Sequence, residues 1–166
     1  MKDRYAPHYW FVAYTRPRCE KKFSKFCTGE GLNYKLPLYG SVKSYRGKTL
    51  IFQKPLFPSY VFLQLQTPEC ARVRQNRYVV RLLQPLDQSE FQAQLADILK
   101  ALESQREVRL APSIRDGQRV TLKSGPLQGL EGIVVRRDGT TEVLMKLDFI
   151  GQAASVRVTV DELELS

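Results

Sequence analysis

The chain has 166 residues, 43% of them hydrophobic and 26% charged, which suits one ordinary globular domain or two small ones. Its three cysteines, Cys19, Cys27 and Cys70, include no Cys-x-x-Cys pair and accompany a single histidine, so the sequence argues against a metal site and predicts free, reduced thiols. The net charge of +9 lies entirely in residues 1–104, which hold 17 Lys and Arg against 8 Asp and Glu, whereas residues 105–166 hold 9 of each.

This distribution bears on partners and on location. A polyanion contact is expected in residues 1–104, although a basic surface that merely keeps the protein soluble has the same charge. No apolar run is long enough to cross a bilayer, and Met1–Trp10 lacks the apolar stretch of a signal peptide. We therefore expect a cytoplasmic protein without membrane contact.

The first predicted elements are a strand and a helix with two distinct sides. Tyr9–Tyr14 is rich in β-favouring residues, Thr15 offers a helix cap, and Pro17 suits the first turn of a helix that ends near Thr28. One arc of the helix is apolar, with Cys19, Phe23, Phe26 and Cys27, and the opposite arc is basic, with Arg18, Lys21, Lys22 and Lys25. Four like charges crowded together favour contact with a DNA or RNA backbone, and a solvated lysine face is the alternative.

The next stretch predicts a basic hairpin and an informative strand. A second strand begins at Leu36–Tyr39, and Lys43–Thr49 is typical of an exposed hairpin tip with Gly47 in its turn. From Tyr60 the chain alternates, so that one face carries Val61, Leu63 and Leu65 and the other carries Tyr60, Phe62 and Gln64. Two interpretations stay open for the aromatic face: a sheet buried on both sides, or a half-exposed surface that anchors a partner.

The remaining elements complete the first domain. Residues 68–75 predict a short helix, residues 77–83 a strand, and residues 87–102 an amphipathic helix that Asp87 and Glu90 cap. The apolar side chains of that helix share one face and are Phe91, Leu95, Ile98, Leu99 and Leu102. This order predicts an α+β domain over residues 1–104, with a mostly antiparallel sheet flanked by helices.

The composition changes after residue 104. Residues 105–112 are polar and include a proline, which predicts a linker. Residues 113–166 alternate glycines with short β-favouring runs, which predicts a small all-β, SH3-like barrel. The expected strands are Arg119–Leu122, Ile133–Val135, Val143–Leu147, Val156–Val160 and Leu163–Leu165.

Together these stretches resemble the NusG family of transcription elongation factors. The opening aromatic strand, the basic helix and the run Pro55–Phe62, Pro-Leu-Phe-Pro-Ser-Tyr-Val-Phe, match its N-terminal domain. The glycine pattern of residues 117–134, with the loop Asp148–Gln152, resembles its KOW domain. The resemblance spans from about Tyr9 to Leu165, and both domains in this order are more specific than a KOW motif alone.

The resemblance implies particular partners. In the family, the aromatic face of the N-terminal sheet receives the clamp helices of the largest RNA polymerase subunit, and the matching residues here are Tyr14, Phe57, Tyr60 and Phe62. Basic residues near the first helix lie beside upstream or non-template DNA, and the nucleic-acid candidates here are Arg16, Arg18, Lys21, Lys22, Lys25, Arg72 and Arg74. The KOW domain contacts a small-subunit ribosomal protein or Rho, and Phe149 and Ile150 occupy the positions of its apolar pair. A monomer without a cofactor is expected.

Departures from the housekeeping pattern bear on the role within the family. The Thr-Pro-Gly-Val turn before the last strand of the sheet is missing, and residues 76–80 read Asn-Arg-Tyr-Val-Val instead. The hairpin around Gly47 resembles that of RfaH-type paralogues, which act as antiterminators. We expect a factor that binds polymerase, reduces pausing and acts as an antiterminator. The alternatives are a housekeeping NusG that cooperates with Rho, or a ribosome- or RNA-binding KOW protein.

An enzyme is not expected. With His8 as the only histidine, the chain has no Ser/His/Asp set, and it shows neither a phosphate-binding glycine loop nor paired carboxylates. RfaH itself can fold its C-terminal domain as a helical hairpin, but Ile133–Val135 and Val156–Val160 are poor helix formers, so strands are expected here.

Overall fold

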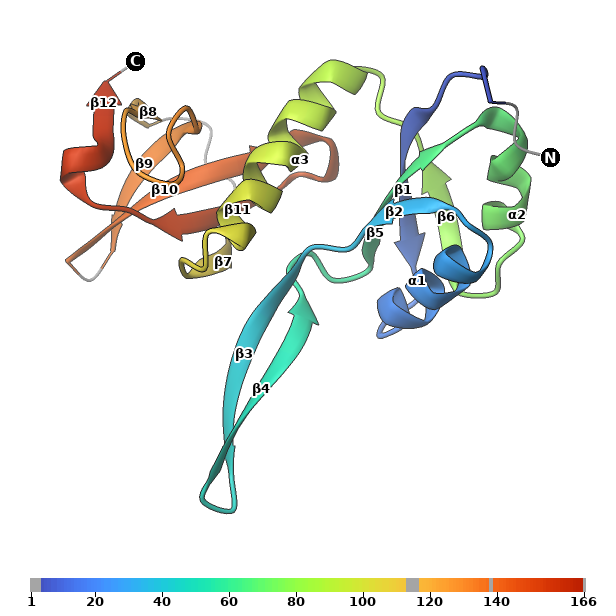
Figure 1. Cartoon of the computed structure of the whole chain (residues 1–166), viewed down its shortest axis with the longest axis horizontal. Coiled ribbons are helices and arrows are strands. Elements are labelled where there is room, and N and C mark those ends of the chain that lie inside the picture. The colour runs from blue at the N-terminus through green and yellow to red at the C-terminus, as the bar shows by residue number, and fades with distance from the viewer. Residues whose placement is uncertain (1–3, 113–116, 138, 166) are drawn as a thin grey trace. The chain divides into compact units, whose positions relative to one another are not determined.

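A computed structural model describes residues 4–112, 117–137 and 139–165 of the chain (Figure 1). Contacts divide the chain into two compact units. The first unit combines residues 1–37 with residues 57–89, and the second combines residues 38–56 with residues 90–166. The predicted α+β N-terminal part and all-β C-terminal part are both present, and each unit is described by itself.

The first unit is built on a four-stranded antiparallel sheet in the order β2-β5-β1-β6. These strands are β1 (Tyr9–Thr15), β2 (Asn33–Lys35), β5 (Tyr60–Leu65) and β6 (Val79–Leu83). The helices are α1 (Glu20–Gly29) and α2 (Cys70–Arg74), the latter preceded by the 3₁₀ turn η1 (Thr67–Glu69). Strands β1 and β5 pair over six residues, from Tyr9 opposite Leu65 to Tyr14 opposite Tyr60.

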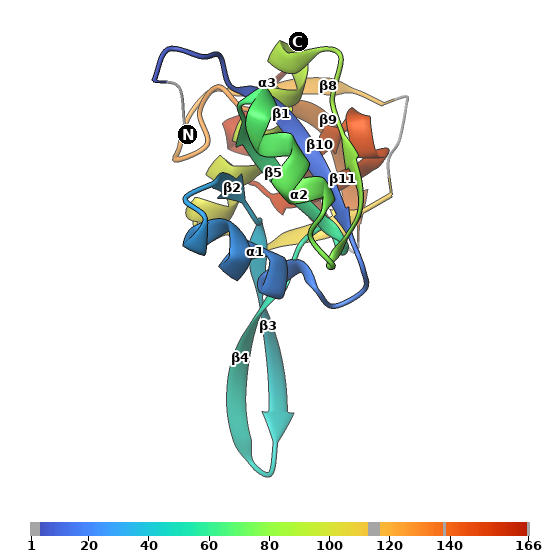
Figure 2. The same cartoon turned by 90° about the vertical axis from the view of Figure 1, so that its right-hand side faces the viewer.

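One face of this sheet carries the core of the unit. Phe11, Ala13, Val61, Leu63 and Leu65 are buried there. They pack with apolar side chains from both helices, namely Phe23 and Cys27 of α1 and Cys70 and Val73 of α2. Figure 2 shows α1 and α2 on the same side of the strands. The alternation predicted for the strand that begins at Tyr60 is therefore confirmed, and burying each large side chain contributes about 1.5–3 kcal/mol.

The start of α1 differs from the prediction. The helix begins at Glu20 rather than near Pro17, and its N-cap position is Cys19, without a side-chain cap. Arg18 has a φ of 61°, a left-handed conformation that cannot belong to an α-helix. The expectation that Thr15 caps the helix was wrong, because Thr15 is the last residue of β1.

The second unit contains a hairpin and a long helix. Strands β3 (Leu38–Tyr45) and β4 (Lys48–Pro55) form a two-stranded sheet of their own. Their turn uses positive φ at Arg46 (49°) and Gly47 (76°), as a two-residue hairpin turn requires, which confirms the predicted tip. Helix α3 (Gln88–Glu103) lies one residue later than predicted, and its first two residues belong to the first unit.

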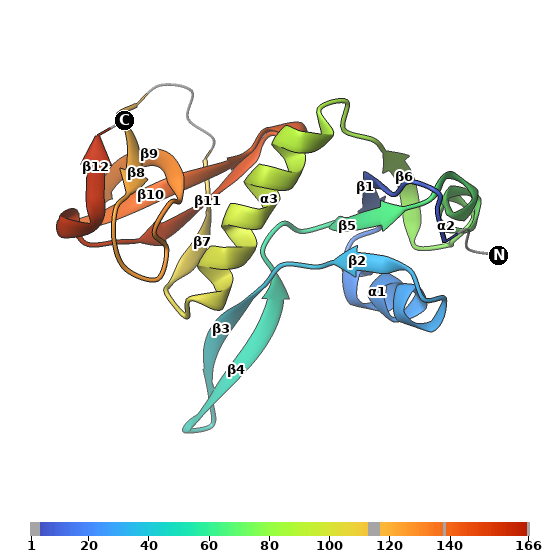
Figure 3. The same cartoon turned by 45° about the horizontal axis from the view of Figure 1, so that its top comes forward.

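The C-terminal part is all-β, as predicted (Figure 3). Its six antiparallel strands follow the order β12-β8-β9-β10-β11-β7. They are β7 (Val108–Ala111), β8 (Arg119–Leu122), β9 (Glu131–Arg137), β10 (Thr140–Leu147), β11 (Gln152–Arg157) and β12 (Leu163–Leu165). Two 3₁₀ turns, η2 (Asp148–Ile150) and η3 (Val160–Glu162), interrupt them.

Two local expectations change in this sheet. The segment predicted as a linker contains β7, which pairs with β11 from Val108 opposite Val156 to Ala111 opposite Ala153. The strand predicted over Val156–Val160 instead ends at Arg157, and Val160 begins η3. The division into domains at residues 104 and 112 stays a prediction.

Candidate functional site

The basic arc of α1 is exposed in the first unit. Lys21, Lys22 and Lys25 lie on the helix opposite its buried Phe23 and Cys27. Arg16 and Arg18, in the turn before the helix, are also exposed. The structure therefore brings five of the seven predicted cations to one helix and the turn before it. The carboxylate in this segment, Glu20, is buried and points elsewhere.

Glu20 holds the loop that leads into β5. Its Oε2 atom accepts a hydrogen bond of 3.0 Å from the backbone N–H of Ser59. The carbonyl of Ser59 accepts one of 2.8 Å from the N–H of Thr15. Ser59 has a φ of 71°, which is strained for a residue with a side chain, so these two bonds hold the loop in a conformation it would otherwise leave. No sequence pattern indicates this role of Glu20.

The aromatic face of the sheet is opposite the buried cluster. The register places Tyr14 between Tyr60 on one neighbouring strand and Arg81 on the other. The rings of Tyr14 and Tyr60 are 5.4 Å apart, centroid to centroid, and Tyr14 is 39% exposed. This row of two tyrosines and an arginine is the accessible part of the predicted surface, and Arg81 was not among the predicted site residues.

The other two predicted aromatic side chains are not exposed to solvent. Phe57 and Phe62 contact each other edge to face, with centroids 6.2 Å apart, and their exposed fractions are 1% and 0%. Of the two interpretations left open for this face, burial on both sides therefore holds for these two residues, and they do not belong to a half-exposed surface. Alternation along a strand identifies the face that a ring occupies, but it cannot tell whether that face is covered.

The remaining predicted cations differ in their surroundings. Arg72 pairs with Glu30 at 2.7 Å, so its charge is partly compensated. Arg74 is exposed at the end of α2. Arg77, which was not predicted, stacks on the ring of Tyr78 at 4.9 Å, and its carbonyl accepts a hydrogen bond from Arg16 Nε at 3.0 Å. Arg77 therefore extends the basic surface beside Arg16.

In the second unit, the loop that holds Phe149 contacts α3. Gln94 of α3 donates to Asp148 Oδ2 at 2.7 Å and accepts from the Asp148 N–H at 2.9 Å. The ring of Phe91 meets that of Phe149 edge to face, with centroids 6.1 Å apart. Phe149 remains 38% exposed, and Ile150 is partly buried. The loop predicted to bind a partner is therefore engaged by the chain's own helix.

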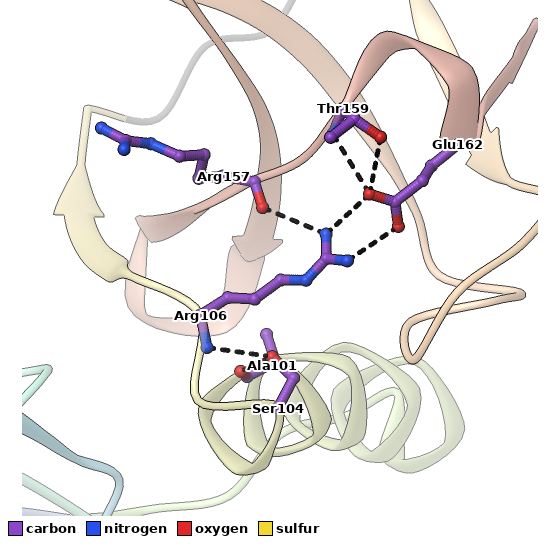
Figure 4. A network of polar contacts seen from close by, with 6 residues as sticks. All are labelled: Ala101, Ser104, Arg106, Arg157, Thr159 and Glu162. Carbon is purple, nitrogen blue, oxygen red and sulfur yellow. Dashed lines mark hydrogen bonds and ion pairs between the residues drawn. The ribbon is translucent and has the colours of Figure 1, made fainter.

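A partly buried ion pair ties the segment after α3 to the end of the C-terminal sheet (Figure 4). Both terminal nitrogens of Arg106 donate to the carboxylate of Glu162, at 2.9 and 3.0 Å, and Nη1 also donates to the carbonyl of Arg157. Thr159 donates to the same carboxylate through its N–H and its hydroxyl. Burial alone would raise the pKa of Glu162, but the hydrogen bonds from Arg106 and Thr159 outweigh it and lower that pKa.

The thiols have the properties of packing residues. Burial raises the pKa of Cys27 to about 12 and also raises the pKa of Cys70, which outweighs the opposing effect of Arg74. All three cysteines are free. Within the described residues, no group of three or more His, Cys, Asp or Glu side chains is placed to hold a metal ion. No helix there has the length and apolar character needed to span a bilayer.

The described residues include exposed rings, exposed cations and a partly exposed apolar loop, which are features of a protein that acts through binding surfaces. Comparisons with known proteins point to a family of such proteins. The family model described as transcription termination factor nusG matches residues 8–100. The transcription termination/antitermination protein NusG of Borreliella burgdorferi is 21% identical over 178 residues, which cover 93% of the chain and 97% of that protein. A solved structure titled "Domain interaction in Thermotoga maritima NusG" shares the fold, with a TM-score of 0.56 and 21% identity over 95% of the chain and 96% of its own.

The family model spans more than half of the chain. The chain therefore belongs to the NusG family of transcription termination and antitermination factors. The structural comparison extends the shared fold across both the α+β part and the C-terminal sheet.

Proposed function

We propose that the protein binds RNA polymerase through the aromatic face of its first unit, reduces pausing and acts as an antiterminator. The observation that carries the proposal is the row of Tyr60, Tyr14 and Arg81 across three neighbouring strands. Tyrosine and arginine are the residue types that most often dominate binding energy at protein interfaces. The clamp helices of the largest polymerase subunit are the proposed partner, and the cytoplasm is the proposed location.

The mechanism is selective binding. A factor that binds one conformation of polymerase more tightly than another shifts the population toward that conformation. The free energy of this shift cannot exceed the difference between its two binding free energies. Phe57 and Phe62 belong to the same face but are buried. Full engagement of the face therefore requires these rings to become accessible, whereas the tyrosine row offers the first contact.

Paired tyrosine variants test the proposal. Tyr14→Ala with Tyr60→Ala should weaken binding to purified polymerase by about 3 kcal/mol, because each truncated anchor costs ~1–2 kcal/mol. The matched control is Tyr9→Ala, since Tyr9 lies on the same strand, has the same exposed fraction of 39%, and alternates to the other face. If the Tyr14 and Tyr60 double variant binds polymerase as tightly as the Tyr9 control and the unaltered chain do, this face is not the interface.

The basic arc of α1 supports a second contact, with upstream or non-template DNA. Phosphate contacts by Lys and Arg make binding salt-dependent, with a slope close to the number of phosphates neutralised. Changing Lys21, Lys22 and Lys25 to Glu should reduce the slope of log affinity against log salt by about 2–3 in a polymerase–DNA complex.

The same charge change in the C-terminal part of the chain provides the control. It is made at three exposed cations, Arg119, Lys123 and Arg136. If the slope responds equally to both triple variants, the effect follows total charge and the α1 contact is refuted.

The C-terminal loop is the proposed site for a further partner, a small-subunit ribosomal protein or Rho. Phe149 is in contact with Phe91, and Asp148 with Gln94, so a partner at this loop competes with α3. Gln94→Ala should strengthen partner binding by about 1 kcal/mol, the net value of the hydrogen bonds released. Titration of labelled protein with each candidate partner would measure this, and an unchanged affinity would argue that the loop is not the site.

A further inference from the structure

The hairpin of β3 and β4 separates its side chains by chemistry. In an antiparallel pair, directly opposite residues share a face and successive residues alternate between faces. The register places eight residues on one face: Tyr39 opposite Lys54, Ser41 opposite Phe52, Lys43 opposite Leu50, and Tyr45 opposite Lys48. We call this the basic–aromatic face. The opposite, neutral face includes Gly40, Val42, Ser44, Thr49, Ile51 and Gln53.

Rings and cations alternate along the basic–aromatic face. Tyr45 is 61% exposed and Phe52 is 45% exposed, so both rings are open to a partner. The Lys43 ammonium lies 5.9 Å from the centroid of Phe52, and the guanidinium of Arg46, in the turn, lies 5.4 Å from that of Tyr45. These contacts hold the rings beside positive charge.

The charge on the hairpin is uncompensated within its own sequence. Residues 38–55 contain four Lys and Arg and no Asp or Glu. Lys54, on the same face, lowers the pKa of Lys43 mainly because the neutral form of Lys43 is favoured beside a second ammonium group, with Tyr39 opposing. A bound anion would relieve this repulsion.

We propose that the basic–aromatic face binds single-stranded nucleic acid, with phosphates at its lysines and unpaired bases stacked on Tyr45 and Phe52. Binding of this kind combines a positive surface with aromatic side chains that tolerate any base. The face spans seven residues along each strand, from Tyr39 to Tyr45 and from Lys48 to Lys54, which is about 20 Å and the length of about six stacked nucleotides. The site uses no residue of α1 and does not require polymerase.

The chemistry favours a single strand over a duplex. The rings need unstacked bases, which an intact duplex does not offer. The face has no amide or carboxylate side chain to recognise base edges, so we expect little preference for sequence or for ribose over deoxyribose. A protein partner would need acidic and apolar side chains together to match this face. If a protein were the true partner, removing the rings would not change the preference for a single strand over a duplex.

Fluorescence anisotropy with the full chain tests the proposal. The probe is a fluorescein-labelled dT12, compared with rU12 and with a 12-base-pair duplex. Tyr45→Ala with Phe52→Ala should weaken dT12 binding about tenfold or more, because each stacked base contributes about fivefold or more. Tyr45→Leu with Phe52→Leu keeps apolar volume in the hairpin and should lose as much, which excludes unfolding as the cause.

The neutral face supplies the matched control. Val42 and Ile51 are each 67% exposed on the same hairpin, and changing both to Ala should leave the affinity within about twofold. The duplex should bind more weakly and respond little to loss of the rings. Changing Lys21, Lys22 and Lys25 to Glu should leave the tenfold ring effect in place, which separates this site from the α1 contact.

Three results would overturn the proposal. One is an affinity for dT12 that the ring variants leave unchanged. Another is an equal loss in the Val42 and Ile51 variant. The third is tighter binding of the duplex than of dT12. Failure of the tyrosine row of the first unit to bind polymerase would affect none of these measurements.

Discussion

Replacing Arg106 with alanine tests whether one partly buried ion pair holds the segment after α3 on the C-terminal sheet. The change removes both hydrogen bonds from the guanidinium to Glu162, which is 7% exposed, and leaves its carboxylate with Thr159 alone. Removing one partner of a fully buried pair costs about 3–5 kcal/mol. We expect about 2 kcal/mol here, because water reaches the guanidinium and Thr159 continues to donate.

Hydrogen exchange of the full chain measures this locally. A loss of about 2 kcal/mol should speed amide exchange in β11 and β12 about 30-fold. Arg157→Ala is the control, because its guanidinium pairs with Glu107 at 3.4 Å and both side chains are more than half exposed. Such a pair contributes about 0–1 kcal/mol, so exchange should rise less than about fivefold. Equal acceleration by both variants would refute the reasoning.

The same pair predicts a dependence on pH. Because the pKa of Glu162 is lowered below its ordinary value of 4.5, its contribution to stability is complete above pH 4.5. It is lost as the pH falls through the pKa of the folded state. Arg106→Ala should therefore flatten the acid limb of the stability profile, and an unchanged limb would show that another carboxylate controls it.

Two further predictions concern packing. Gly132→Ala should destabilise the second unit by about 1–3 kcal/mol in thermal unfolding, because a Cβ there would lie 2.4 Å from a backbone carbonyl oxygen of β10. The control is Gly29→Ala, whose Cβ would meet nothing within 4 Å, so this change should be neutral or stabilising. A thiol reagent at pH 8 should modify the partly exposed Cys19 first and reach the buried Cys27 and Cys70 only on unfolding, and simultaneous reaction of all three would contradict the assigned burial.

The sequence predicted those features that local chemistry determines. Alternation from Tyr60 gave the faces of β5, a Gly in a basic tip gave the hairpin turn, and apolar spacing gave α3 to within one residue. Each depends on residues close together along the chain, so the pattern alone determines the outcome.

Features that depend on distant residues could not be predicted. The burial of Phe57 and Phe62 depends on what covers a face, which no alternation encodes. Strand β7 exists because its backbone pairs with β11, more than 40 residues later, although its own sequence is typical of a linker. The row of Tyr14, Tyr60 and Arg81 likewise appears only once the strand order is known.

Glu20 provides the sharpest test of how the loop before β5 positions the aromatic face. Glu20→Ala removes the acceptor for the Ser59 N–H and leaves the left-handed conformation of Ser59 without one of its two anchors. A lost hydrogen bond to a charged acceptor costs about 1.5–3 kcal/mol, which should speed exchange of the Ser59 amide at least tenfold. Because the loop leads into Tyr60, polymerase affinity should fall as well, although Glu20 itself contacts no partner. Glu20→Gln keeps an oxygen acceptor and should restore most of both properties. If the Ala variant binds polymerase normally while its Ser59 amide exchanges fast, the order of this loop does not matter for the interface.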